Sequence, residues 1–479
     1  MLIPEEESAE GIVGTKRPEG RNGGKEQHRM LDRGLAPDQP LTLPVAQQRG
    51  EASVGAPGES TPGGDGRLME RVVERPNLLT ALARVTANGG SPGIDGLTVE
   101  ALPAYLRQHW PERRAELLAG SYRPSPGRRG NIPKPGGGVR QLGLPTVLDR
   151  LIQQAALQVL QPEWDQTFSA HRDGFRPGRS APPAIARAQQ DLEDGYTWGV
   201  DLELAKVFDR VHHDTLMSLG KGRIADHRVR QLIDRYLTAG VLTGDGFEAT
   251  VEGMPQGGPL SPLVANLRLE GFDKELERRG HRFVRYADDS HISVKSLRAG
   301  QRVLASVTRF LERRWKRTVN AAKRAVDRPW RRTCLGFTFT RRRPHRRQGS
   351  GKALKALQQE VPQRTGRTRG VSLPCVVDDL RQSLNGWHAY CRVAEGQSPF
   401  KELDSWVRRR LRGDVWKQWG RRRYRELRKR GVSQDLAWNT HKSAHGPWRL
   451  SRSPALAIAL PGQSLDRVGV PRLYQRSRR

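Results

Sequence analysis

The chain has 479 residues, with 83 Lys+Arg against 51 Asp+Glu, which leaves a formal net charge of +32 at pH 7. A surface charge on this scale opposes compaction unless a polyanion neutralises it, so nucleic acid is the expected partner. A small acidic substrate would not need so much charge. No apolar run approaches the roughly 20 residues of a membrane-spanning helix, which excludes insertion into a bilayer.

Secretion is also not expected. The sequence opens with Met1-Leu2-Ile3-Pro4 and runs into three glutamates, without the basic start and apolar core of a signal peptide. The three cysteines, Cys334, Cys375 and Cys391, are too scattered for a disulfide framework or a paired-cysteine zinc site. These features predict a cytoplasmic protein without disulfides that binds nucleic acid.

The first half of the chain changes character near residue 66. Residues 1–65 are rich in Gly, Glu, Pro, Gln and Arg and have no sustained apolar period, so they predict a disordered tail. Residues 66–125 predict a helical extension, because apolar residues recur every three or four positions. Residues 126–340 mix helices with short β-rich runs, and the clearest helical stripe covers residues 148–160.

The second half begins with a strongly basic run. Residues 341–347 contain five arginines, and Gln, Gly and Ser follow them, so residues 341–370 predict a charged, flexible linker. Residues 371–479 have helical patterning and carry six of the eleven tryptophans. They predict a separate, mostly helical domain.

Two adjacent carboxylates form the sharpest chemical signal. Asp288 and Asp289 stand between two β-prone runs within residues 283–294, which predicts a hairpin with both acids at its tip. For an isolated Asp-Asp pair, a solvated turn is the ordinary interpretation. The functional alternative is a divalent metal site, because side-by-side carboxylates are unfavourable unless a cation or water screens them.

A second acidic segment about eighty residues upstream favours the metal site. Asp201 and Glu203 alternate with apolar residues, so both acids share one face of a half-buried strand. Phe208 and Asp209 would begin the following helix. A strand carboxylate beside a hairpin carboxylate pair is how a two-metal polymerase site is built.

With these motifs in place, the sequence resembles the group II intron-encoded reverse transcriptase–maturases of bacterial type. Tyr286-Ala287-Asp288-Asp289 is similar to the YxDD box of reverse transcriptases. Four further segments resemble that family in the family's order, namely residues 132–145, 174–180, 253–262 and 335–339. The resemblance implies an α/β right-hand polymerase over residues 126–340, with fingers and an antiparallel palm sheet, followed by an all-α thumb or maturase domain over residues 371–479.

The resemblance also implies roles for single residues. Glu203, Asp288 and Asp289 would be catalytic and would hold two Mg²⁺ ions, with Mn²⁺ as a substitute and Asp201 as an additional ligand. The implied nucleotide-binding residues are Arg140, Lys134, Phe208, Gln256 and Lys323. Arg176 and Arg179 would contact RNA phosphates. Each basic residue taken singly is also compatible with an ordinary solvated charge.

One departure from the family pattern concerns the metal ligands. The family's first metal-binding aspartate falls on Glu203, which keeps the charge but adds a methylene group. Catalysis is sensitive to a displacement of that size, on the order of 10²-fold. Asp201 lies two residues earlier on the same face and would partly compensate. We therefore expect weakened or lost polymerase activity, and predict that Glu203→Asp raises it.

The C-terminal domain carries an arginine-rich amphipathic helix near residues 403–419. Basic residues interleaved with aromatic rings fit RNA, because guanidinium groups grip phosphates and rings stack on unpaired bases. The residues expected to bind RNA here are Arg408, Arg409, Arg410, Arg412, Trp416 and Trp419. A solvated helix face is the alternative. This region resembles the maturase domain of the same family.

The resemblance implies an RNA-directed DNA polymerase that binds its intron RNA and assists splicing and mobility. Its implied partners are intron RNA, an RNA template with a DNA primer, and dNTPs; a homodimer is compatible with the sequence. The implied location is the bacterial cytoplasm, with nucleoid association during mobility. No paired cysteines and histidines follow the maturase segment, so an endonuclease domain is not expected. The alternative is a maturase without polymerase activity, acting only as an RNA-binding splicing cofactor.

Overall fold

The computed structural model describes residues 66–133, 138–204, 212–254, 256–315, 324–366, 370–396 and 398–474, without the side chains of 314 and 315. The predicted disordered tail at 1–65 lies outside these residues. Lys134, Phe208 and Lys323 lie outside them as well. Within the described ranges, no helix combines the length and apolar character that crossing a membrane needs.

The N-terminal helices surround a long central helix, α5 (Val147–Asp165), which confirms the helical stripe predicted over residues 148–160. Thr146 caps α5, because its hydroxyl accepts a hydrogen bond from the backbone N–H of Asp149. Twelve residues of α5 are buried. The helices that pack with α5 in one apolar core are α2 (Leu68–Val72), α3 (Arg75–Asn88), α4 (Leu102–Ala119), α7 (His213–Lys221), α8 (His227–Thr238) and α9 (Ser261–Arg278).

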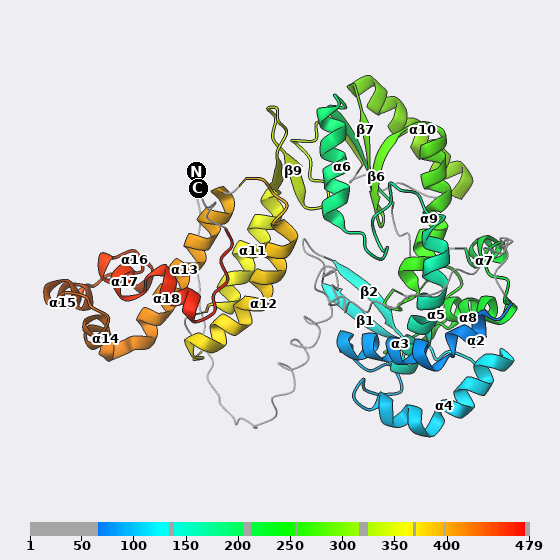
Figure 1. Cartoon of the computed structure of the whole chain (residues 1–479), viewed down its shortest axis with the longest axis horizontal. Helices are drawn as coiled ribbons and strands as arrows, with labels where there is room; N and C mark the ends of the chain where they lie inside the picture. The colour runs from blue at the N-terminus through cyan, green and yellow to red at the C-terminus, as the bar shows by residue number, and fades with distance from the viewer. Residues whose placement is uncertain are drawn as a thin grey trace, which may run out of the picture.

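A small sheet lies beside this helical core, with the strand order β2-β1-β4-β5. Its strands are β1 (Gly127–Pro133), β2 (Val139–Leu144), β4 (Val241–Thr243) and β5 (Gly246–Glu248). β1 pairs antiparallel with β2 and parallel with β4. Figure 1 shows β1 and β2 between the N-terminal helices and the C-terminal part of the chain.

The central sheet has the strand order β6-β7-β3-β8, and every neighbouring pair is antiparallel. Its strands are β3 (Trp198–Glu203), β6 (Arg282–Tyr286), β7 (Asp289–Val294) and β8 (Ala325–Asp327). Apolar residues of these strands pack with α9 and α10 (Leu297–Trp315) in a second core, while α6 (Ala181–Glu193) lies against β6. The alternation of apolar and polar residues along β3 therefore buries one face and presents the other to the site.

The C-terminal helices form a separate lobe, which the hairpin of β9 (Phe337–Phe339) and β10 (Arg347–Gly349) joins to the central sheet (Figure 1). Its longest helices are α11 (Gly351–Arg364), α12 (Leu373–Cys391) and α13 (Ser398–Trp419). After the 3₁₀ turn η1 (Gly420–Arg422), five short helices complete the lobe: α14 (Arg423–Lys429), α15 (Gln434–Lys442), α16 (Pro447–Leu450), α17 (Pro454–Ala459) and α18 (Gly462–Arg467).

The segment interpreted from sequence as a basic linker, residues 341–370, contains β10 and α11 instead. Its arginines at 341–343 are exposed, whereas Leu357 and Val361 are buried against the apolar core of the C-terminal lobe. The density of charge near residue 341 concealed a short apolar pattern at helical spacing. The ordered C-terminal lobe therefore begins earlier in the chain than predicted.

Candidate active site

The hairpin predicted around the two aspartates is confirmed by β6 and β7. Tyr286 pairs with Asp289 as the last pair of the ladder, so Ala287 and Asp288 form a two-residue turn. Ala287 adopts a left-handed conformation with φ of 55°, as such tight turns require. Asp288 is half-buried and Asp289 is exposed at the end of the hairpin.

The register of the central sheet brings the upstream acid to this turn. Glu203 is the direct cross-strand partner of Asp289 in the β3–β7 ladder. The backbone N–H of Leu204 donates to the carbonyl oxygen of Asp288 at 3.2 Å, which ties the end of β3 to the turn. Three carboxylates, from Glu203, Asp288 and Asp289, are therefore carried by neighbouring backbone positions at one edge of the sheet.

Asp201 lies on the same strand, and two side chains of the protein contact its carboxylate. One of its carboxylate oxygens is 2.7 Å from Nδ1 of His291, and the other accepts from Nε of Arg332 at 2.9 Å. Burial would raise the pKa of Asp201, but the contacts with His291 and Arg332 outweigh it and lower that pKa. Both oxygens are thus used inside the protein, and Asp201 fastens the 328–334 segment to the sheet.

The ligand chemistry of the carboxylate edge fits a hard divalent cation, because carboxylate oxygens are the ligands that Mg²⁺ prefers. Cys334 lies close enough that burial, together with the charges of Asp201 and Asp289, raises the pKa of its thiol far above the ordinary value. Among the residues that the structure describes, no group of three or more acids, histidines or cysteines is arranged tightly enough to hold a metal ion. The carboxylates are neighbours along the backbone rather than a closed metal cage.

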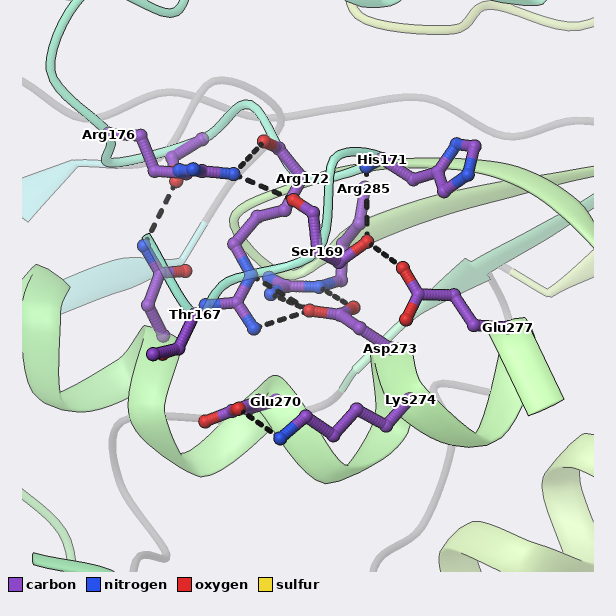
Figure 2. A network of polar contacts seen from close by, with 12 residues as sticks. Thr167, Ser169, His171, Arg172, Arg176, Glu270, Asp273, Lys274, Glu277 and Arg285 are labelled. Atoms are coloured by element: carbon purple, nitrogen blue, oxygen red, sulfur yellow. Dashed lines mark hydrogen bonds and ion pairs between the residues drawn. The ribbon is translucent and has the colours of Figure 1, made fainter. Parts of the chain in front are cut away.

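A buried ionic cluster supports the hairpin from behind, and sequence reasoning missed it. Figure 2 shows Asp273 of α9 between the guanidinium groups of Arg172 and Arg285, and all three side chains are 0% exposed. Asp273 accepts from Nε of Arg172 at 2.8 Å and from Nε and Nη2 of Arg285 at 2.5 and 2.7 Å. We call these three residues the buried triad.

The buried triad is joined directly to the carboxylate turn. Nη1 of Arg285 donates to the carbonyl oxygen of Ala287 at 2.6 Å. The backbone of Arg285 also bonds to residues 171 and 173, so Arg172 forms an isolated parallel bridge with β6. A Cβ atom on Gly174 would lie 2.2 Å from the backbone nitrogen of Ala287, so only glycine lets the chain pass this close to the turn.

Arg176 and Arg179, expected to contact RNA, are instead held by the protein. Arg176 is 8% exposed and forms a bidentate contact with Asp165 at 2.6 and 3.0 Å. It also donates to the carbonyl oxygen of Ser169 at 2.7 Å. Nη1 of Arg179 donates to the carbonyl oxygen of Ala170 at 2.8 Å. Glycines and prolines around Arg176 indicated an open loop, whereas the loop folds onto α5. Contact of Arg176 and Arg179 with RNA stays a prediction.

Two predicted nucleotide-binding residues flank the small sheet. Arg140 lies on β2 opposite Ile132 and is exposed. The carbonyl oxygen of Gln256 accepts from the N–H of Gly143 at 3.0 Å, so the glycine-rich segment is tied to β2. Gly257 has φ of 131°, a conformation that favours glycine. The structure thus brings Arg140 and Gln256 to the same sheet.

In the arginine-rich helix α13, most of the residues predicted to contact RNA also contact other parts of the protein. Arg408 is 6% exposed and pairs with Asp404 at 2.7 Å and with Asp466 at 2.8 Å. Trp416 is 1% exposed and belongs to an apolar core, with the half-buried Trp419 packed against it. The spacing of Asp404 and Arg408, four residues apart on a helix, could have indicated the ion pair.

The other three arginines of this group are half-buried. Arg409 donates to the carbonyl oxygen of Trp448 at 3.0 Å, and its guanidinium carbon lies 3.6 Å from the centre of that ring. Arg410 donates to the hydroxyl of Thr365 at 2.9 Å, and Arg412 donates to the carbonyl oxygen of Leu460 at 2.9 Å. These contacts hold α13 against its neighbours.

The sheet with its carboxylates and the helical lobe after it form the arrangement expected of a polymerase followed by a second, helical domain. Residues 132–339 match the family described as reverse transcriptase (RNA-dependent DNA polymerase). Residues 354–431 match the group II intron maturase-specific domain. The chain therefore belongs to the group II intron reverse transcriptase/maturase family.

Individual relatives agree with this assignment. The chain is 39% identical to Protein YkfC of Escherichia coli (strain K12) over 44% of its own length and 58% of that protein. It is 38% identical to the group II intron-encoded protein LtrA of Lactococcus lactis subsp. cremoris over 43% of its length and 34% of LtrA. The matched segment thus spans less than two thirds of either relative. A solved Cas6-RT-Cas1–Cas2 complex matches 52% of this chain and 43% of that chain at 24% identity, with a TM-score of 0.34 that is too low to support an inference.

Proposed function

We propose that the protein is an RNA-directed DNA polymerase that also binds its intron RNA and assists splicing and mobility. The observation that carries the polymerase proposal is the register of the central sheet, which pairs Glu203 with Asp289 and ties β3 to the turn at Asp288. Family membership supports the same activity.

In the proposed architecture the central sheet is the palm, the small sheet belongs to the fingers, and the C-terminal helices form the thumb and maturase domain. A primer–template duplex would then lie across the carboxylate edge, between the small sheet and the helical lobe. The two sheets on one side and the helices α11 to α13 on the other, as arranged in Figure 1, support this assignment.

Glu203, Asp288 and Asp289 are the residues proposed to hold two Mg²⁺ ions, with Mn²⁺ as a substitute. When bound, the ions would activate the primer 3′-hydroxyl and neutralise the triphosphate. The chain's own contribution is to hold the carboxylates at the end of the sheet, since the buried triad fastens the turn from behind. Catalysis of phosphoryl transfer rests on positioning of this kind together with electrostatic stabilisation.

The incoming dNTP is proposed to lie between the small sheet and the carboxylate edge. Arg140 and Lys134 would contact the triphosphate, and Gln256 would contact the template–primer backbone. Phe208 would stack under the sugar and exclude a 2′-hydroxyl, and Lys323 would add positive charge. The exposed side chain of Arg140 supports its part in this proposal.

Intron RNA is proposed to bind the exposed basic surface at the far end of the C-terminal lobe. Arg421, Arg422 and Arg425 are exposed there, whereas Arg408 of α13 is buried and Arg409, Arg410 and Arg412 are half-buried. Exposed guanidinium groups can form charge-assisted bonds to phosphates without first breaking internal contacts. We therefore add these three residues to the proposed RNA interface.

Primer extension on an RNA template with a DNA primer and dNTPs, in Mg²⁺ or Mn²⁺, tests the polymerase proposal. Asp288→Asn keeps the side-chain size but removes the charge, and should lower extension by at least about 10²-fold. Asp378→Asn, an exposed acid on α12, is the matched control and should leave extension unchanged. Extension that survives in Asp288→Asn would contradict the assignment of the site.

A splicing cofactor without polymerase activity is the second candidate function. It is favoured by Glu203 at the aspartate position of the family. Normal RNA binding together with no extension in either metal, by the wild type and by Glu203→Asp alike, would establish this second function in place of the first.

A further inference from the structure

The central sheet carries a hollow at the end opposite the carboxylates. Its volume is about 530 Å³, within the range of small-ligand sites. It lies between the start of β6, the end of β7 and α10. The side chains that matter for its chemistry are Tyr196, Arg279, Arg282, Lys295, Arg302 and Ser306. We call it the basic pocket.

The basic pocket is separate from the candidate active site. Arg282 pairs with Ser293 at the pocket end of the β6–β7 ladder, and Tyr286 pairs with Asp289 at the carboxylate end. Four residues of extended strand separate the two ends, which corresponds to roughly 13 Å. A ligand in the pocket would therefore not touch the groups proposed to act in polymerisation.

Two of the four cations are fixed by carboxylates. Arg279 pairs with Glu275 at 2.7 Å and donates to the hydroxyl of Ser306 at 2.8 Å. Arg282 pairs with Asp194 and, at 3.3 Å, with Asp191. These contacts neutralise both arginines and hold them in place at the wall of the pocket, leaving other N–H groups of each guanidinium as donors.

The other two cations are not neutralised by a neighbouring carboxylate among the described residues. Lys295 and Arg302 are exposed, and neither forms an ion pair with any of the residues that the structure describes. The ammonium nitrogen of Lys295 lies 5.2 Å from the centre of the Tyr196 ring, and the guanidinium carbon of Arg282 lies 4.6 Å from it. The pocket thus combines two uncompensated positive charges with an aromatic ring.

We propose that the basic pocket binds the phosphate group of a nucleotide, with Lys295 and Arg302 as the charged contacts and Tyr196 beside the sugar or base. A phosphate suits this arrangement because it accepts several bonds at once from ammonium and guanidinium donors. An aromatic ring next to cations is a recurrent feature of surfaces that bind unpaired nucleotides. The phosphate can belong to an RNA strand or to a free nucleotide.

Lysine footprinting of the full-length chain tests the proposal at the residue concerned. The protein is acetylated with an N-hydroxysuccinimide ester alone, with a single-stranded RNA 20-mer, or with ATP, and modification is measured by mass spectrometry. We expect Lys295 to be protected in at least one of the two ligand arms, while the exposed Lys221 on α7 reports general reactivity. Protection by RNA alone identifies a strand-binding site, and protection by ATP identifies a free-nucleotide site.

Two double variants test whether ligand affinity depends on the position of the charges in the pocket or only on the total charge of the protein. Lys295→Ala/Arg302→Ala should lower the affinity for whichever ligand protects Lys295. For RNA, the loss of two phosphate contacts at 0.15 M salt should lower the affinity about tenfold, and should reduce the slope of log affinity against log salt concentration by about 1.4. Arg298→Ala/Arg309→Ala removes two exposed charges from α10 outside the pocket lining, and should change affinity by less than about twofold. Thermal unfolding of both doubles checks that each remains folded.

Two results would overturn the proposal: equal acetylation of Lys295 in all three arms, or equal loss of affinity in the two double variants. Neither depends on polymerisation, so a chain that extends no primer still gives a decisive footprint. Conversely, primer extension on a short duplex should be unchanged by Lys295→Ala/Arg302→Ala, because the pocket lies away from the carboxylate edge.

Discussion

Removing the charge of Asp273 should destabilise the protein far more than a comparable change on the same helix. In Asp273→Asn the side chain keeps its size, but two buried guanidinium groups lose their shared counter-ion. All three side chains of the buried triad are 0% exposed, so water cannot replace the lost charge. Breaking a buried ion pair from one side costs about 3–5 kcal/mol.

In the wild-type triad, burial and the neighbouring charges already shift the pKa values of Arg172 and Asp273. Burial and the like charge of Arg285 together lower the pKa of Arg172 to about 10. Burial would raise the pKa of Asp273, but the two arginines lower it on balance. A lowered carboxyl pKa stabilises the folded state above the unfolded pKa, and this contribution is lost as pH falls through the folded pKa. The stability gap between wild type and Asp273→Asn should therefore close in acid.

Thermal unfolding at pH 7 measures the effect. At about 2–4 °C per kcal/mol for a domain of 150–250 residues, the expected loss in Tm is on the order of 10 °C. Glu275→Gln is the matched control, because Glu275 is on α9 and pairs with Arg278 and Arg279 at the surface. It should cost less than about 1 kcal/mol. A Tm for Asp273→Asn within about 3 °C of wild type would refute the role of the triad.

Three further predictions follow from the site and the C-terminal lobe. Glu203→Asp should raise primer extension, because the shorter side chain restores the carboxylate position of the family; unchanged or lower activity would mean that the site is adapted to glutamate. Arg408→Ala should lower Tm, since it leaves Asp404 buried without its partner at a cost of about 3–5 kcal/mol; Arg421→Ala, at an exposed position, should lower RNA affinity in filter binding without changing Tm. Iodoacetamide at pH 8 should alkylate the exposed Cys375 first, because burial raises the pKa of Cys391 to about 12 and that of Cys334 further still; equal labelling of all three thiols would contradict the packing around β9.

The parts of the site that depend on local sequence pattern were predictable. Asp288 and Asp289 lie between two β-prone runs, and Glu203 follows strict alternation, so the hairpin and the strand could both be derived from single segments. The pairing of the strand with the hairpin could be expected only from the family resemblance. The two segments are about eighty residues apart, and neither contains a sequence pattern that indicates how they align. The structure supplied that register as the pair Glu203 and Asp289.

The buried triad could not be derived in this way. Arg172 and Asp273 are 101 residues apart, and the contact between them depends on the backbone pairing of residues 171–173 with Arg285 of β6. In the sequence, Arg172 stands in a polar loop and Asp273 in an ordinary amphipathic helix. One hint was available: Asp273 directly follows the fully buried Phe272 and lies three residues before Leu276, a spacing that turns a carboxylate toward the core.

The net charge of +32 overstates the surface available to nucleic acid, because arginine also builds the interior. Arg172, Arg285, Arg176 and Arg408 are each less than 9% exposed, and each is matched by carboxylates or backbone carbonyls. Guanidinium suits this use, since its five donors can satisfy several acceptors at once. The charge that can reach phosphates lies instead at exposed positions without such partners, as at Lys295 and Arg302 beside the central sheet. Binding experiments on this family member should therefore select basic residues by exposure and partners, not by their density in the sequence.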